Sequence, residues 1–102
     1  MSDIPDPEAC VTMTDVRAGV DSVDQRLVAL LDERFAFMRA AARIKPERGH
    51  VRDEARKAQV IDNVAAEAAR LGLPVEALRE IWDRLVEASI VYEMAEFDRL
   101  KG

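Results

Sequence analysis

Arg34 and Lys45 are the basic residues whose spacing most directly suggests chemistry in this sequence. Arg34 interrupts an apolar repeat, and a buried guanidinium needs a partner because an unpaired buried charge is costly. Lys45 follows eleven residues later. That spacing is close to three helical turns, so the two side chains share one helix face about 16 Å apart along the axis. Together they could hold an anion that lies between them.

Arg17 has the same charge but a different position relative to that face. It stands seventeen residues before Arg34, which places it roughly 260° around a helix and about 25 Å along its axis. Arg17 cannot reach the same site within its own chain. If it serves such a site, it serves the site of a partner chain.

Ser89 and Glu93 are polar positions in an otherwise apolar stripe near the C-terminus. They are four residues apart, so on a helix one lies above the other. Either both face solvent at the margin of the stripe, or both belong to a site. The presence of Arg34 and Lys45 favours the second interpretation.

Other reactive residue types give weaker indications. Cys10 has no base marked nearby and is expected to pack at the start of a helix, while His50 is expected to be solvated in a loop. The sequence contains no glycine-rich phosphate loop and no cluster with metal-ligand spacing. We therefore expect neither nucleotide nor metal chemistry.

A long helix from about residue 14 to residue 45 would carry Arg17, Arg34 and Lys45. Its apolar residues recur three and four apart, the spacing of a helix packed along another helix: Val16, Val20, Val23, Leu27, Leu30, Phe37, Ala41 and Ile44. Thr12 and Asp15 form a capping box before it, and Pro46 ends it. A helix of this length spans about 45 Å, which is too long for the rest of a small chain to cover. A partner chain is the simplest cover.

Two further helices are expected after a loop at 46–52. The first runs from about Asp53 to Leu71 and is stopped by Gly72, and the second runs from Pro74 to about Leu100. The expected fold is therefore all-α, a three-helix chain with a long N-terminal helix that a partner chain covers. We expect residues 1–12 to be a loosely ordered tail and residues 13–102 to be a single domain.

Composition supports a soluble helical protein, with 49% hydrophobic and 34% charged residues. The net charge of −5 argues against a nucleic-acid partner, which would require a basic surface. A single cysteine, no signal-like segment and no long apolar run make the cytoplasm the expected location and argue against a membrane partner.

Several motifs together resemble the all-helical class of bacterial chorismate mutases. They are VRAGVDSVDQRLVALLDER, a lysine eleven residues after its last arginine, VRDEAR, and ASIVYE in the last helix. The resemblance covers about residues 13–98. It implies an intertwined homodimer of three-helix chains with two active sites, which convert chorismate to prephenate without cofactor or metal.

The resemblance also implies a role for each site residue. Arg34, Lys45 and Glu93 would be catalytic; Arg17 of the partner subunit, Asp53, Arg56 and Ser89 would bind substrate. The cations would hold the two carboxylates of chorismate, and Lys45 with Glu93 would face its ether oxygen. Such an intramolecular [3,3] rearrangement needs a site that selects the folded conformer and stabilises developing charge.

Two positions depart from the family pattern. Lys57 stands where typical members have a glutamate that receives the substrate hydroxyl, and Glu93 stands where bacterial members mostly have glutamine. Glu93 must be protonated to donate a hydrogen bond. The loss of the family glutamate at position 57 and the N-terminal PEAC segment also resemble isochorismate pyruvate lyase, a relative with the same fold. That enzyme is the alternative function. A third possibility is a non-catalytic helical dimer that binds a regulatory anion or a protein.

Overall fold

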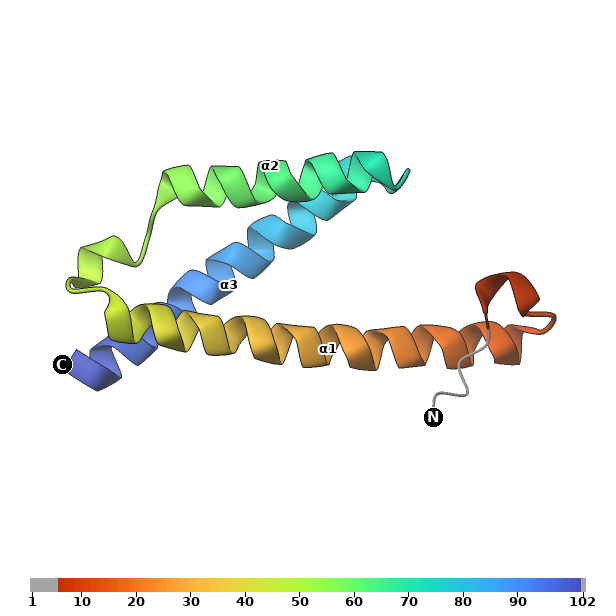
Figure 1. Cartoon of the computed structure of the whole chain (residues 1–102), viewed down its shortest axis with the longest axis horizontal. Coiled ribbons are helices and arrows are strands. Elements are labelled where there is room, and N and C mark those ends of the chain that lie inside the picture. Colours follow the sequence, from red (N-terminus) through yellow and green to blue (C-terminus); the bar gives the residue numbers. More distant parts are fainter. Residues whose placement is uncertain (1–5, 102) are drawn as a thin grey trace. The chain divides into compact units, whose positions relative to one another are not determined.

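The computed structural model describes residues 6–101, and in this part of the chain the secondary structure is entirely helical. The three α-helices are α1 (Met13–Ile44), α2 (Glu54–Arg70) and α3 (Val75–Lys101) (Figure 1). Two short 3-10 helices, η1 (Pro7–Ala9) and η2 (Arg48–His50), precede α1 and α2. The all-α fold with a long N-terminal helix is confirmed.

The chain divides into two compact units inside α1. The first, Met1–Arg34, holds η1 and most of α1, and the second, Phe35–Gly102, holds the last turns of α1 together with η2, α2 and α3. The expected boundary between a tail at 1–12 and a domain at 13–102 stays a prediction.

In the first unit, the start of α1 is fixed by a reciprocal capping box. The Asp15 N–H donates to the Thr12 hydroxyl at 3.1 Å, and the Thr12 N–H donates to the Asp15 carboxylate at 3.2 Å. The Val11 N–H also donates to this carboxylate, and these hydrogen bonds lower the pKa of Asp15. Residues 7–9 of the expected tail form η1, while residues 1–5 lie outside the described part. The predicted cap is confirmed.

The apolar stripe of α1 in the first unit is uncovered. Its residues are 38–59% exposed: Val16, Val20, Val23, Leu27 and Leu30. Among residues 6–101, no helix combines the length and the apolar character that crossing a membrane requires. An exposed apolar stripe along several helical turns indicates a surface that another protein element covers.

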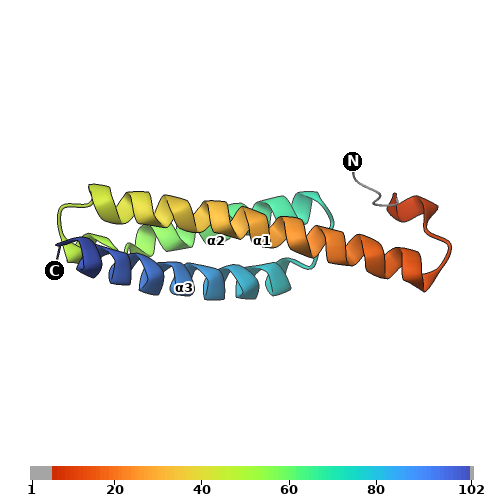
Figure 2. The same cartoon turned by 90° about the horizontal axis from the view of Figure 1, so that it is seen from below.

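In the second unit, α2 and α3 form an antiparallel hairpin that closes at residues 71–74 (Figure 1). The turn contains Gly72, whose φ of 73° is costly for any residue with a Cβ. The C-terminal end of α3 lies beside the last turns of α1 (Figure 2). Buried apolar residues from these elements make the core: Ala42, Val51, Val86, Ile90 and Phe97, with Val60 and Met94 packed against them.

The connection at 46–52, expected to be a loop, contains η2 and is fastened to α3. Val51 is only 4% exposed and belongs to the core. Arg48 makes a bidentate ion pair with Asp98, at 2.8 and 3.2 Å. The chain therefore enters α2 along a fixed path, which matters because predicted site residues stand at both ends of this connection.

Candidate active site

An ion pair with a buried carboxylate joins the end of α1 to α3. Lys45 directly follows α1, and its N–H still donates to the Ala41 carbonyl at 2.9 Å, so its backbone continues the last helical turn. Its ammonium lies 2.7 Å from Oε2 of Glu93, whose side chain is 5% exposed. Ile90 and Phe97 of the core stand three residues before and four residues after Glu93, so they flank it on the same face of α3. Screening by water is therefore weak at the Glu93 end of the pair.

One oxygen of Glu93 is left with capacity for a further partner. Oε2 is buried and accepts no hydrogen bond of good geometry from any described residue. The 2.7 Å contact with Lys45 is consequently an ion pair in which the angles are poor for a hydrogen bond. No other buried side-chain oxygen or nitrogen within residues 6–101 lacks a partner. Because buried polar groups are normally satisfied, such an atom suggests a place where a ligand completes the contacts.

The last turn of α3 fastens the backbone of Lys45. The Lys101 ammonium donates to the Lys45 carbonyl and also lies 4.7 Å from the centre of the Phe97 ring. The Lys45 side chain keeps 30% of its surface exposed. The ammonium is thus positioned by a fixed backbone while it remains reachable from solvent.

Ser89 lies one turn before Glu93 on the same face of α3 and is 3% exposed. Its hydroxyl donates to the Leu85 carbonyl at 2.7 Å, the common back-bond of a serine inside a helix. The alternative in which Ser89 and Glu93 face solvent is therefore wrong. The structure brings Lys45, Ser89 and Glu93 together in the second unit.

Asp53 and Arg56 stand at the start of α2 and are exposed. Asp53 is the N-cap residue, since its carboxylate accepts the Arg56 N–H at 3.0 Å. The Arg56 guanidinium donates to the Gln59 side chain at 2.5 Å. Their expected part in substrate binding stays a prediction.

Arg17 and Arg34 belong to the first unit. Arg34 is half-buried and engaged in interactions. Arg17 is exposed, and its side chain makes no hydrogen bond or ion pair with any residue from 6 to 101. The expected roles of both arginines, including the contribution of Arg17 across a dimer interface, stay predictions.

An ion cluster between α2 and α3 was not predicted from the sequence. Lys57 lies 2.7 Å from Glu87 and 3.0 Å from Asp83, and Arg52 binds Glu87 through two hydrogen bonds at 2.7 and 3.1 Å. We call Arg52, Lys57, Asp83 and Glu87 the α2–α3 charge cluster. Asp83 and Glu87 are four apart, and this spacing was the available signal.

The charge cluster changes the titration of its members. The two hydrogen bonds from Arg52, followed by that from Lys57, lower the pKa of Glu87 from its ordinary value of 4.5 to about 2. Glu87, followed by Asp83, raises the pKa of Lys57. Glu87 and Lys57 therefore carry full charge near neutrality.

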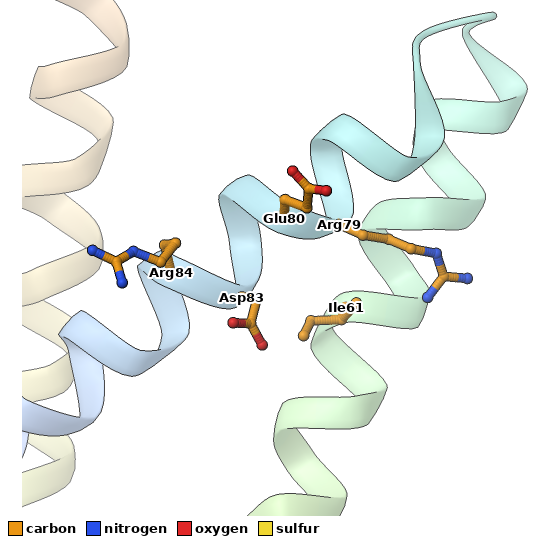
Figure 3. Close-up of a pocket in the computed structure, with 5 residues that line it drawn as sticks. All are labelled: Ile61, Arg79, Glu80, Asp83 and Arg84. Carbon is orange, nitrogen blue, oxygen red and sulfur yellow. The ribbon is translucent and has the colours of Figure 1, made fainter.

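A hollow of about 530 Å³ lies beside the charge cluster and is lined by Ile61, Arg79, Glu80, Asp83 and Arg84. None of the predicted site residues lines it. In Figure 3, Arg79 reaches from α3 to α2, Asp83 lies toward Ile61, and Arg84 leaves α3 on the other side. Within the described residues, no group of histidine, cysteine, aspartate or glutamate side chains could hold a metal ion.

The fold and site define a helical protein in which a lysine at the end of the long helix pairs with a buried glutamate of α3. Residues 16–94 match the family "Chorismate mutase type II", and the chain belongs to this family. The match includes every predicted site residue from Arg17 to Glu93, and it confirms the resemblance to the all-helical chorismate mutases. No curated protein matches the sequence.

Proposed function

We propose that this protein is a chorismate mutase that converts chorismate to prephenate. The observation that carries the proposal is the Lys45–Glu93 ion pair, which lies within the family match and whose buried carboxylate oxygen Oε2 accepts no hydrogen bond from the described residues. In the reaction one C–O bond breaks and one C–C bond forms within the same molecule. No atom is gained or lost, so the site needs only to orient the substrate and stabilise charge.

Each predicted site residue has a role in this proposal. Lys45 stabilises the negative charge that develops on the ether oxygen, and protonated Glu93 donates a hydrogen bond to the same atom. Arg34 and the partner's Arg17 bind the two substrate carboxylates, because the planar guanidinium fork matches a carboxylate. The remaining substrate contacts come from Asp53, Arg56 and Ser89. No cofactor or metal takes part.

The protein functions as a homodimer in this proposal. The uncovered stripe of α1 supports a second copy as the cover, because an exposed apolar face along several turns is unfavourable in water. Arg17 lies on the same helix segment and has no partner within residues 6–101, so it is available to a site of the other subunit. We assign the reaction to aromatic amino acid biosynthesis in the cytoplasm.

One assay tests this function. The purified protein is incubated separately with chorismate and with isochorismate, and products are identified by chromatography. Prephenate from chorismate is the expected result. If neither compound is converted, the proposal that the protein is an enzyme is refuted. A non-catalytic dimer that binds an anion or another protein would then be favoured.

Isochorismate pyruvate lyase is the second candidate function, and the environment of Lys57 favours it. The Lys57 ammonium is bound to two α3 carboxylates, so position 57 offers no acceptor for the ring hydroxyl of chorismate. Salicylate and pyruvate formed from isochorismate, without prephenate from chorismate, would establish the lyase.

A further inference from the structure

Lys57 links the first turn of α2 to α3 through both its backbone and its side chain. Its N–H donates to the Asp53 carbonyl at 3.0 Å, which closes the first turn of α2. Its ammonium lies between Glu87 at 2.7 Å and Asp83 at 3.0 Å, and the side chain is only 18% exposed. An ammonium held by two carboxylates has little remaining charge to offer an anionic ligand.

Glu87 is the point at which two anchors of α2 meet. Arg52, one residue before the N-cap Asp53, binds both oxygens of Glu87. Lys57, four residues after that cap, binds one of the same oxygens. Asp53 and Arg56 therefore lie in the segment 52–57, both ends of which bind the carboxylate of Glu87.

We propose that Lys57 is a positioning residue: by holding Asp83 and Glu87 it fixes the first turn of α2, and with it Asp53 and Arg56, without binding substrate itself. The inference rests on the proposed function insofar as Asp53 and Arg56 bind the substrate. It explains the departure from the family pattern at position 57. A glutamate there would face Asp83 and Glu87 and would repel both, so this α3 sequence disfavours an acid and favours a cation at that position.

The chain also provides a matched control for a general loss of helix-helix contact. Arg79 of α3 lies 3.7 Å from Asp62 of α2, and Figure 3 shows it crossing toward α2. This pair joins the same two helices, but nearer to the turn at 71–74 and away from Asp53. Removing the Arg79–Asp62 pair tests whether the loss of any α2–α3 ion pair has the same effect as the loss of the Lys57 pairs.

The test compares Lys57→Met, Lys57→Arg, Glu87→Gln and the control Arg79→Met in the full-length protein. The first measurement is amide hydrogen exchange at Arg56 and Lys57, whose N–H groups bond to Asp53. The second is steady-state kinetics with chorismate. Circular dichroism verifies that each variant is folded.

For Lys57→Met we expect the two amides to exchange about tenfold faster, because the first turn of α2 opens more often. We expect KM to rise about tenfold with kcat within about twofold, because substrate binding is weakened uniformly. Lys57→Arg keeps the cation and should restore both quantities. Glu87→Gln should raise the exchange rates and KM as Lys57→Met does, and it tests the same ion pairs if Lys57→Met does not fold. Arg79→Met should match the wild type in both measurements.

Wild-type exchange and KM in Lys57→Met would overturn the proposal. A fall in kcat with unchanged KM and unchanged exchange would also overturn it, since Lys57 would then act on the reacting substrate. If the wild type converts neither chorismate nor isochorismate, the proposed function fails. The exchange measurement then decides alone whether Lys57 fixes the start of α2.

Discussion

The ion pair with Lys45 and the proposed reaction require different protonation states of Glu93. In the structure its side chain is 5% exposed and forms an ion pair with the Lys45 ammonium at 2.7 Å. As a carboxylate it cannot donate a hydrogen bond, and a donor is what an ether oxygen with developing negative charge requires. The proposed mechanism therefore needs a proton on Glu93 in the reactive complex.

The replacement Glu93→Gln tests this requirement. The wild-type kcat/KM should rise as pH falls, because the protonated form that can donate becomes more populated. Glu93→Gln has a donor at every pH, so its profile should be flat. At alkaline pH it should exceed the wild type by up to about 100-fold, the usual contribution of one such donor.

The control for this experiment is Glu80→Gln, which removes an exposed carboxylate outside the predicted site. Its pH profile should match that of the wild type. All rates must be measured where circular dichroism shows an intact fold. A wild type that is fastest above neutrality would mean that Lys45 acts on the ether oxygen without Glu93.

The α2–α3 turn depends on the backbone of Gly72. The Leu73 N–H donates to the Ala68 carbonyl at 2.8 Å and the Gly72 N–H to the Ala69 carbonyl at 3.2 Å, the pattern of a Schellman helix end. Gly72 has a φ of 73°, and a Cβ added there would meet no neighbouring atom within 4 Å. A side chain at position 72 would therefore destabilise the turn through backbone strain. It would not clash with neighbouring atoms.

Gly72→Ala should lower the free energy of unfolding by about 1 kcal/mol, the cost of a left-handed conformation for a residue with a Cβ. Gly49→Ala is the matched control, because Gly49 also has open space around it but does not have a positive φ. Urea unfolding followed by circular dichroism measures both. Equal stability of the two variants would contradict the role of Gly72.

The charge cluster predicts how the hairpin responds to acid. The pKa of Glu87 is about 2 in the folded protein, below its ordinary value of 4.5. Its contribution to stability is therefore complete above pH 4.5 and is lost as pH falls toward 2. The stability difference between wild type and Glu87→Gln should shrink over this range in urea titrations. A difference that stays constant from about pH 6 to about pH 2 would show that Glu87 is not paired in the folded state.

At the scale of the whole molecule, the uncovered stripe of α1 predicts that folding depends on protein concentration. If a second copy covers the stripe, dilution should dissociate the dimer and reduce helicity together, because the separated chain exposes its apolar face. Sedimentation and circular dichroism over a dilution series measure this coupling. A fully helical monomer at micromolar concentration would refute the obligate dimer.

Subunit mixing tests whether Arg17 serves the site of its partner. Arg17→Ala and Arg34→Ala should each reduce kcat/KM by about 100-fold or more, since each removes a charge aimed at a substrate carboxylate. When the two variants are refolded together, each heterodimer should regain one complete site. A mixture as inactive as its parents, with heterodimers shown to be present, would count against a shared site.

The sequence by itself determined the helices and their ends, because these depend on neighbouring residues. The Thr12–Asp15 box, Pro46, the Asp53 cap and Gly72 each act within a few positions of the chain. The motifs around Arg34 and VRDEAR also sufficed to indicate the family that the match over 16–94 establishes. The same information could not say which polar groups would be buried.

The tertiary structure decided the environment of the candidate site. The burial of Ser89 and Glu93 and the contact with Lys45 depend on residues more than forty positions apart. The charge cluster likewise joins Lys57 to acids about thirty positions later. Periodicity locates a polar residue on a helix face, but only the packing of a second helix fixes which charges meet there, because Coulomb attraction and desolvation both depend on distances between elements.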